Sequence, residues 1–365
     1  MRHVLRMTLT GAAGITFVFL VDAANLFWIS RIGDTRLVAA MGFVFAIQFF
    51  SVSFGIGLMI SATAIISRFI GLGRRDLARE HVSSLILLAF IFQLAVATVI
   101  ALFRHELVEL NGAKGYTALL AERYLLTTIF SLPIMVIGMM GSAALRADGQ
   151  AIKAMTVTLF PGGLAMLVDP ILIIWLELKL DGAAIALWIS RIAMASVALF
   201  FLISKNDFLG KPSLKTICSS IRPFFRIAIP AILSQLAAPF GNYAVTTVVS
   251  GFGDSAVAAW AVINRLTIVA FGGIFSLSGA LGGIFGQNYG ADNFQRLRRI
   301  YIDGLLFCFG YTSIVWIVLI SARDLVVIGF KINMEGLDIL DAFISVGVIS
   351  FAFTGMMFVA TAAFN

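Results

Sequence analysis

The chain has 365 residues, of which 60% are hydrophobic and only 12% are charged, with a formal net charge of +7. Soluble globular domains carry about twice this charged fraction, which excludes a soluble fold. With a mean hydropathy of +1.01, the chain is predicted to be an all-α, polytopic helical membrane protein. The basic residues are spread over short connections, so no nucleic-acid partner is expected. Cys218 and Cys308 are too few for a disulfide framework.

Charges, glycines and prolines divide the chain into ten apolar segments, each long enough for the about 20 residues that a bilayer requires. In chain order they are 8–30, 38–67, 82–103, 118–145, 151–176, 182–203, 224–250, 256–286, 300–320 and 339–363. The N-terminus and the connections on its side hold more than twice as many Lys and Arg residues as the opposite connections. Because positive charge favours the cytoplasmic side, we expect an integral protein of a bacterial inner membrane with its N-terminus in the cytoplasm.

The two halves of the chain resemble each other. "RIGDTRLVAAMG" at 31–42 matches "GFGDSAVAAWAV" at 251–262, and "GLGRRDLAR" at 71–79 matches "NYGADNFQR" at 288–296. "GMM" recurs at 138–140 and 355–357, and all three matches share an offset of about 217–220 residues. Since each half holds an even number of spans, the copies share one orientation in the membrane. We predict an N-terminal lobe over 1–204, a cytoplasmic linker over 205–222 and a C-terminal lobe over 223–365.

The second copy is shorter than the first. At the repeat offset Asn365 corresponds to Asp148, where the fourth span of the first copy ends. We therefore expect two six-helix lobes of which the second lacks its last two spans in this chain. Truncation of a twelve-span protein is favoured over a natural short form, because the sequence stops directly after the apolar stretch "FVATAAFN".

One helix-packing motif stands out in the second half. Gly282 and Gly286 form a GxxxG step inside the span 256–286. Small residues at this spacing let two helix backbones approach closely, so we predict a tight helix contact there.

Five motifs, in order and spacing, connect the chain with a known family. They are "NLFWISRIGDTRLVAAMG" (25–42), "LRADGQ" (145–150), "VDPILI" (168–173), "DGAAIA" (181–186) and "GQNYGADN" (286–293). With them the chain resembles the multidrug and toxic compound extrusion (MATE) transporters. The resemblance implies a twelve-span, V-shaped pair of six-helix lobes and cation-coupled export of amphipathic, often cationic compounds. We expect a monomer in the lipid bilayer that binds a small-molecule substrate and needs no cofactor beyond a coupling ion.

The chain also departs from the family pattern. Many members carry an aspartate just before the "FW" step of the first span, where this chain has Asn25, and the nearest acid is Asp22 about one turn earlier. Ala165 and Leu187 replace an asparagine and a threonine that many members have, while Asp169 is retained. Either the carboxylate has moved one turn along the same face, or Asp169 carries more of the coupling.

Two acids, Asp22 and Asp169, lie deep in the predicted spans. A carboxylate at mid-membrane costs roughly 3 kcal/mol, and such residues usually face a partner or an aqueous cavity. Asn25 shares a helix face with Asp22, and Pro170 removes a backbone donor and so frees a carbonyl near Asp169. We predict that Asp22 and Asp169 bind the coupling cation, H⁺ or Na⁺, with Asn25 as a neutral ligand. The alternative is that these residues only form interhelical hydrogen bonds.

Further polar and adaptable side chains in the spans are candidates for a substrate cavity. They are Trp28, Gln48, Met139, Gln235 and Asn242. Methionine and aromatic side chains suit varied ligands, whereas interhelical contacts and core packing are the alternative use of the same residue types.

Three other possibilities stand beside a secondary-active antiporter. A lipid-linked oligosaccharide flippase of the same superfamily would need a cation-rich cavity, and this interior has few cations, mainly Arg191 and Arg265. Those two side chains, with Arg123, are expected to pair between helices or to reach the interface. The sequence contains no HExxH or GxSxG motif, so no enzyme is predicted. The third possibility is an inactive fragment.

Overall fold

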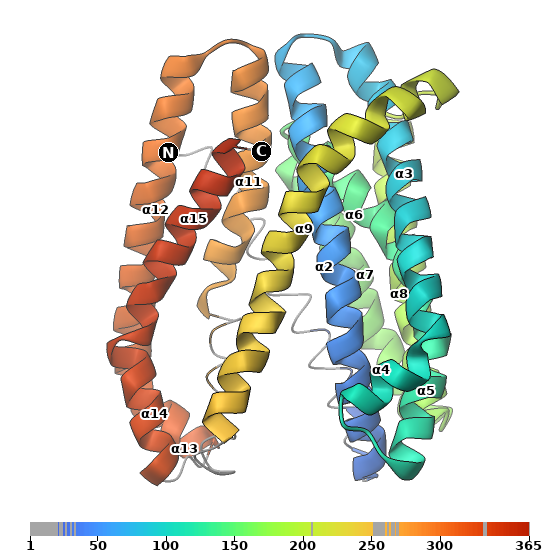
Figure 1. Ribbon diagram of the computed structural model, residues 1–365, viewed down its shortest axis with the longest axis vertical. Helices are drawn as coiled ribbons and strands as arrows, with labels where there is room; N and C mark the ends of the chain where they lie inside the picture. The colour runs from blue at the N-terminus through green and yellow to red at the C-terminus, as the bar shows by residue number, and fades with distance from the viewer. Residues whose placement is uncertain are drawn as a thin grey trace.

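The computed structural model describes residues 21, 25, 28–29, 31–32, 34–205, 207–250, 260, 263, 267, 270–330 and 334–364. Throughout these residues the regular structure is helical, which confirms the all-α prediction. Figure 1 shows two groups of helices that stand side by side along the long axis.

Within the described residues, the first group contains seven α-helices and two π-helical turns. They are α2 (Thr35–Gly71), α3 (Arg75–Leu102), α4 (Arg104–Leu110), α5 (Gly115–Ile129), α6 (Leu132–Ala147), α7 (Ala151–Pro170), η1 (Ile171–Trp175), α8 (Lys179–Phe200) and η2 (Phe201–Lys205). The second group contains α9 (Leu214–Ser250), α11 (Gly272–Gly290), α12 (Phe294–Ser321), α13 (Arg323–Phe330), α14 (Met334–Ser345), the 3-10 turn η3 (Gly347–Ile349) and α15 (Ser350–Phe364).

Seven of the described helical segments are long and apolar enough to cross a membrane, and the bent pair α5–α6 makes an eighth. The predicted spans 38–67, 82–103, 151–176 and 182–203 each coincide with one of them. The first predicted span, 8–30, lies largely outside the described residues. Much of the span 256–286 also lies outside them, and its later part is α11.

Two predicted spans are interrupted. The span 118–145 consists of α5 and α6, which meet at an angle of 45°. Pro133 lies at the start of α6, a position where proline is favoured because its missing N–H would have no partner in the helix. The segment 339–363 is likewise divided, since α14 ends at Ser345 and the membrane-length helix begins at Gly347.

Side-chain caps begin two of the described helices, α2 and α12. The carboxylate of Asp34 accepts a hydrogen bond from the Arg36 N–H at 3.0 Å and begins α2. The amide of Asn293 accepts from the Arg296 N–H at 3.3 Å and begins α12. Such caps satisfy backbone donors that have no partner in the first turn of a helix.

The two groups meet along α2, which packs against α9 and α11. Figure 1 shows α9 crossing α2 obliquely. The predicted close contact at the GxxxG step is confirmed, because a Cβ added to Gly286 would lie 1.8 Å from the Ser67 hydroxyl of α2. Gly286 therefore lets α2 and α11 approach more closely than a residue with a Cβ would allow, whereas a Cβ at Gly282 would meet Thr63 Cγ2 at an ordinary 3.9 Å.

The connection between α2 and α3 and the connection between α11 and α12 lie at the same end of the molecule, at the top of Figure 1. The short helices α4, α13 and α14 lie at the opposite end. Corresponding segments of the two sequence copies thus share one direction, and the two-lobe fold of the prediction is confirmed.

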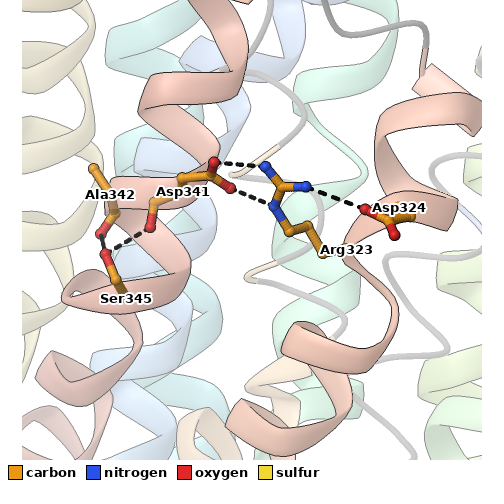
Figure 2. Close-up of polar contacts among 5 residues, drawn as sticks. All are labelled: Arg323, Asp324, Asp341, Ala342 and Ser345. Carbon is orange, nitrogen blue, oxygen red and sulfur yellow. Dashed lines mark hydrogen bonds and ion pairs between the residues drawn. The ribbon is translucent and has the colours of Figure 1, made fainter.

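At the lower end of the second lobe, one arginine joins α13 to α14. Figure 2 shows the Arg323 guanidinium donating to both carboxylate oxygens of Asp341, at 2.6 Å each, and to Asp324 at 3.1 Å. The Ser345 hydroxyl donates to the backbone carbonyl of Asp341 at 2.6 Å. The hydrogen bonds from Arg323 lower the pKa of the Asp341 carboxyl below its usual value.

Candidate functional site

A buried amide–carboxylate pair lies inside the first lobe. Asn25 Nδ2 donates a hydrogen bond to Asp169 Oδ1 at 2.9 Å, across 144 residues of sequence. Asn25 is 6% exposed and Asp169 is 1% exposed. Two of the three residues predicted for cation coupling are therefore in direct contact. The third, Asp22, lies outside the described residues.

One helical turn further along, each of the two segments carries a buried isoleucine. Ile29 follows Asn25 by four positions, and Ile173 follows Asp169 by four positions, so each isoleucine lies on the same helix face as its polar partner. Both isoleucines are fully buried or nearly so, and they belong to one hydrophobic cluster. The amide–carboxylate contact therefore lies one turn from an apolar cluster to which both segments contribute.

The helix that carries Asp169 is irregular beyond this point. Pro161 and Pro170 both lie inside α7, and the next residues form the π-helical turn Ile171–Trp175. A proline provides no backbone N–H, so the carbonyl four residues earlier does not receive its usual helical hydrogen bond. π-Helical turns interrupt the regular ladder and are frequent at functional sites. The use of backbone carbonyls near the carboxylate as oxygen ligands stays a prediction.

A second buried polar cluster surrounds Arg191 of α8. Its guanidinium donates to the Thr128 carbonyl and to Gln48 Oε1, both at 3.1 Å, and also to the Ser131 hydroxyl. Gln48 Nε2 in turn donates to the Thr128 hydroxyl oxygen at 2.6 Å. Arg191 lies about 18 Å along α8 from Lys179 at 1.5 Å per residue, which is near the middle of a bilayer. One side chain thus links α8 to α2 and to the bend between α5 and α6.

This cluster also gives two predicted residues a definite place. Arg191 forms the interhelical contacts that were expected for it, and Gln48, a candidate cavity residue, is part of the same network. Arg123, the other cation expected to pair, donates to Asp181 at 2.7 Å. Arg265 lies outside the described residues.

The other candidate cavity residues are distributed over the molecule. Met139 is buried in a hydrophobic cluster with Leu58, while Trp28 packs against the separate cluster that contains Ile29. Gln235 is half-buried on α9. Asn242 lies on the same helix, and its side chain is not among those that the structure describes. The structure therefore does not gather these residues around one described cavity.

The sequence did not single out several buried polar residues. Thr128 and Ser131 at the α5–α6 bend are fully buried, as is Gln93, whose Nε2 donates to the Ser51 carbonyl at 3.1 Å and to its hydroxyl at 2.7 Å. These residues could have been recognised from the sequence, because each is a polar residue in or beside an apolar span. Over the described residues, no group of three or more His, Cys, Asp or Glu side chains is placed to hold a metal ion.

Comparison with known proteins identifies the family. The MatE family model matches residues 12–171 and 230–365, which is most of the chain. The chain belongs to the MATE family of transporters. It is accordingly an integral membrane protein, and MATE proteins are transporters rather than enzymes.

Solved structures agree with this MATE assignment. A crystal structure of a mutant of the Vibrio cholerae MATE transporter VcmN matches with a TM-score of 0.92 and 25% identity, over 99% of this chain and 83% of that one. The bent form of VcmN matches with a TM-score of 0.91, also at 25% identity, over 99% of this chain and 83% of that one.

Two curated MATE relatives are named for different transported compounds. A FAD transporter of Shewanella oneidensis is 26% identical over 370 residues, covering 100% of this chain and 82% of its own length. The multidrug export protein MepA of Staphylococcus aureus is 27% identical over 278 residues, covering 73% of this chain. The present chain spans only 59% of the length of MepA.

Proposed function

We propose that this MATE protein is an antiporter that exports amphipathic, mainly cationic small molecules in exchange for H⁺ or Na⁺. The observation that carries the proposal is the buried contact between Asn25 and Asp169. A carboxylate inside a membrane span is costly and marks an ion pathway or a proton relay in many transporters. Binding of a proton or Na⁺ neutralises its charge, and the neighbouring amide keeps the carboxylate in one orientation.

The geometry suggests how ion binding could alter the lobe. An ionised Asp169 accepts a hydrogen bond from the amide nitrogen of Asn25, as observed. A protonated Asp169 can instead donate to the amide oxygen, which requires the Asn25 amide to turn over. That change occurs one helical turn from Ile29 and Ile173, which belong to one hydrophobic cluster of the lobe. The ion then shifts the balance between transporter conformations by the difference in its affinity for them.

The decisive experiment compares Asp169→Asn, Asn25→Ala and Asp22→Asn in proteoliposomes, with proton and Na⁺ gradients applied separately. We expect Asp169→Asn to abolish gradient-driven export while the protein still inserts, and Asn25→Ala to weaken it. Asp22→Asn shows whether the carboxylate one turn earlier shares the coupling. A matched control is Asp207→Asn, which removes an exposed carboxylate paired with Arg79. Full gradient-driven export by Asp169→Asn would rule out the proposed site.

A second substrate class is FAD. It is favoured by the relative that spans the whole of this chain and carries the name FAD transporter. Export of cationic dyes and of FAD should therefore be measured in the same proteoliposomes. Transport of FAD without transport of any dye would show that FAD, and not a cationic compound, is the substrate class. The coupling site would then still be tested by the variants of Asp169, Asn25 and Asp22.

We also propose that the N-terminus lies in the cytoplasm of a bacterial cell. The support is the excess of basic residues in the connections on that side. Cys218 is exposed near the start of α9, at the end of the molecule that carries these connections, and Cys308 is buried. A membrane-impermeant maleimide should label Cys218 in inside-out vesicles and not in intact cells. Labelling of intact cells would reverse the proposed orientation.

A further inference from the structure

The first turns of α9 extend beyond what a membrane span requires. The helix has 37 residues, and at 1.5 Å per residue it is about 55 Å long. The hydrocarbon core of a bilayer is only about 30 Å thick, so several turns of α9 lie outside it. Figure 1 places the first turns at the upper end of the molecule, level with the connections of both lobes.

Three basic side chains form a stripe along these turns. Lys215, Arg222 and Arg226 follow each other at spacings of seven and four residues. At 100° per residue they lie within about 40° of one another around the helix axis. All three are exposed. Across the described residues none of them takes part in an ion pair.

An apolar stripe runs directly beside the basic one. It consists of Leu214, Cys218, Ile221 and Phe225, at spacings of four, three and four residues. Leu214 is 81% exposed and Ile221 is 43% exposed, while Phe225 is half-buried. A helix with adjacent apolar and basic faces is typical of a segment that lies at a membrane interface.

The third face of the same turns is fixed to the protein. Ser220, Phe224 and Ala228 are buried. The Ser220 hydroxyl lies 2.9 Å from His81 Nδ1 of α3, and the Thr216 hydroxyl donates to Glu80 at 3.2 Å. These contacts hold α9 against α3, so its basic and apolar stripes face outward together.

The surrounding charges favour an anionic partner. The sequence contains no Asp or Glu between Asp207 and Asp254. Asp207 itself is paired with Arg79 at 2.7 Å, and Glu80 accepts from the hydroxyl on the protein-facing side of α9. The basic stripe is therefore left to solvent and lipid headgroups.

We propose that the basic stripe of α9 (Lys215, Arg222 and Arg226) binds the headgroups of anionic phospholipids, with the apolar stripe beside it in contact with their acyl chains. Basic residues at this depth attract anionic headgroups, and the exposed Leu214 and Ile221 explain why the partner is a lipid rather than a free anion. The site is independent of the transported substrate and of the coupling ion.

The location gives such binding a structural consequence. The segment before α9 is attached to α3, because Phe208 is fully buried and the Gly210 N–H donates to the Arg79 carbonyl at 3.1 Å. Headgroups bound to the basic stripe would therefore hold α9 where the chain passes from the first lobe to the second. Anionic lipid is expected to stabilise the connection between the lobes.

The test uses the two cysteines of the protein. Cys218 lies in the apolar stripe and is exposed, whereas Cys308 is buried, so a fluorophore can be attached to Cys218 selectively in the full chain. The labelled protein is placed in bilayers that contain either a brominated anionic phospholipid or its brominated zwitterionic analogue at equal mole fraction. Quenching then reports the local enrichment of each lipid around the stripe.

We expect the anionic lipid to be enriched and the preference to weaken at high salt, because salt screens exposed charges. Each basic residue near the surface strengthens binding about fivefold, so three provide a preference of up to about a hundredfold. The triple variant Lys215→Gln, Arg222→Gln, Arg226→Gln should lose most of it. Helical content by circular dichroism and elution as a single species confirm that the variant is folded.

The matched control changes the three exposed arginines of α12 in the same way: Arg296→Gln, Arg298→Gln and Arg299→Gln. This control should keep the lipid preference at Cys218. Equal quenching by both lipids in the unmodified protein, or an unchanged preference in the α9 variant, would overturn the proposal. Displacement of the anionic lipid by millimolar inorganic phosphate would instead identify a site for free phosphate.

Discussion

The contact between α2 and α11 makes a quantitative prediction for Gly71. A Cβ at this position would lie 2.0 Å from the carbonyl oxygen of Gln287, and 2.7 Å and 2.9 Å from its carbonyl carbon and Cα. These are backbone atoms, which cannot rotate away as the end of a side chain can. Ordinary contact begins near 3.4 Å, so Gly71→Ala forces the two backbones apart by about 1.4 Å at this point.

The expected cost follows from two opposing effects. Overpacking of a tight contact costs about 1–3 kcal/mol, while replacing glycine by alanine in a helix contributes up to about 1 kcal/mol of stabilisation. With the full helix gain subtracted, the close approach of α2 and α11 should become less favourable by up to about 2 kcal/mol. That difference changes the ratio of two conformations by up to about 30-fold, in favour of one in which this end of the lobes is separated.

The assay is a distance distribution between spin labels at Arg74, near the start of α3, and Arg298 of α12, both exposed and on different lobes. The background carries Cys218→Ser, so that only the introduced cysteines are exposed to labelling. We expect Gly71→Ala to increase the population with the longer distance.

The matched control is Gly282→Ala on the same helix pair. The nearest atom to a Cβ there is Thr63 Cγ2, at an ordinary contact distance of 3.9 Å. This variant should leave the distance distribution unchanged. The reasoning would be refuted if Gly71→Ala altered neither the distances nor the unfolding temperature, or if Gly282→Ala produced the same change.

Two further predictions concern polar contacts elsewhere. Arg191→Met removes the donor to Gln48 Oε1 and one of the donors to the Thr128 carbonyl, and we expect a loss of about 1–3 kcal/mol in the free energy of unfolding; an unchanged unfolding temperature in detergent would contradict this. His105 contacts Glu122 at 2.8 Å and Glu109 at 3.4 Å, and the hydrogen bond to Glu122 raises the pKa of His105 above 6.5. Its stabilisation is therefore present below about pH 6.5 and is lost as the pH rises through the raised pKa. The protection factors of the α4 amides, corrected for the intrinsic pH dependence of exchange, should fall with pH over this range in the unmodified protein and not in His105→Gln.

Much of the helical framework followed from hydropathy, but the interruptions did not. The spans 38–67 and 82–103 match α2 and α3 except that both helices extend further toward their charged connections. The bend between α5 and α6 was missed because the residues on both sides of it are apolar, so a hydropathy average does not change there. Pro133 was the local signal. At the bend itself, the Thr128 carbonyl and the Ser131 hydroxyl accept hydrogen bonds from Arg191.

The polar contacts within the lobe show a different limit of sequence reasoning. A buried charge such as Arg191 can be recognised from its position in an apolar span, and interhelical pairing was the expected outcome. Its partners lie 60, 63 and 143 residues away. Choosing them requires the rotation and depth of each helix, which depend on how the small side chains of all the helices pack. The sequence therefore identified the residue but not the network.

For the contact between Asn25 and Asp169, the sequence indicated both residues but not the hydrogen bond between them. The rarity of acids in the spans and the family pattern pointed to Asp169, whereas the direct hydrogen bond depends on how the two segments pack in the lobe. With an amide at position 25, this contact contains one ionisable group. A carboxylate there, as many family members have, would place two acids at hydrogen-bonding distance, and the pair would then share a proton. The asparagine thus limits the charge of the observed contact to a single negative charge, so that one H⁺ or one Na⁺ is sufficient to neutralise it.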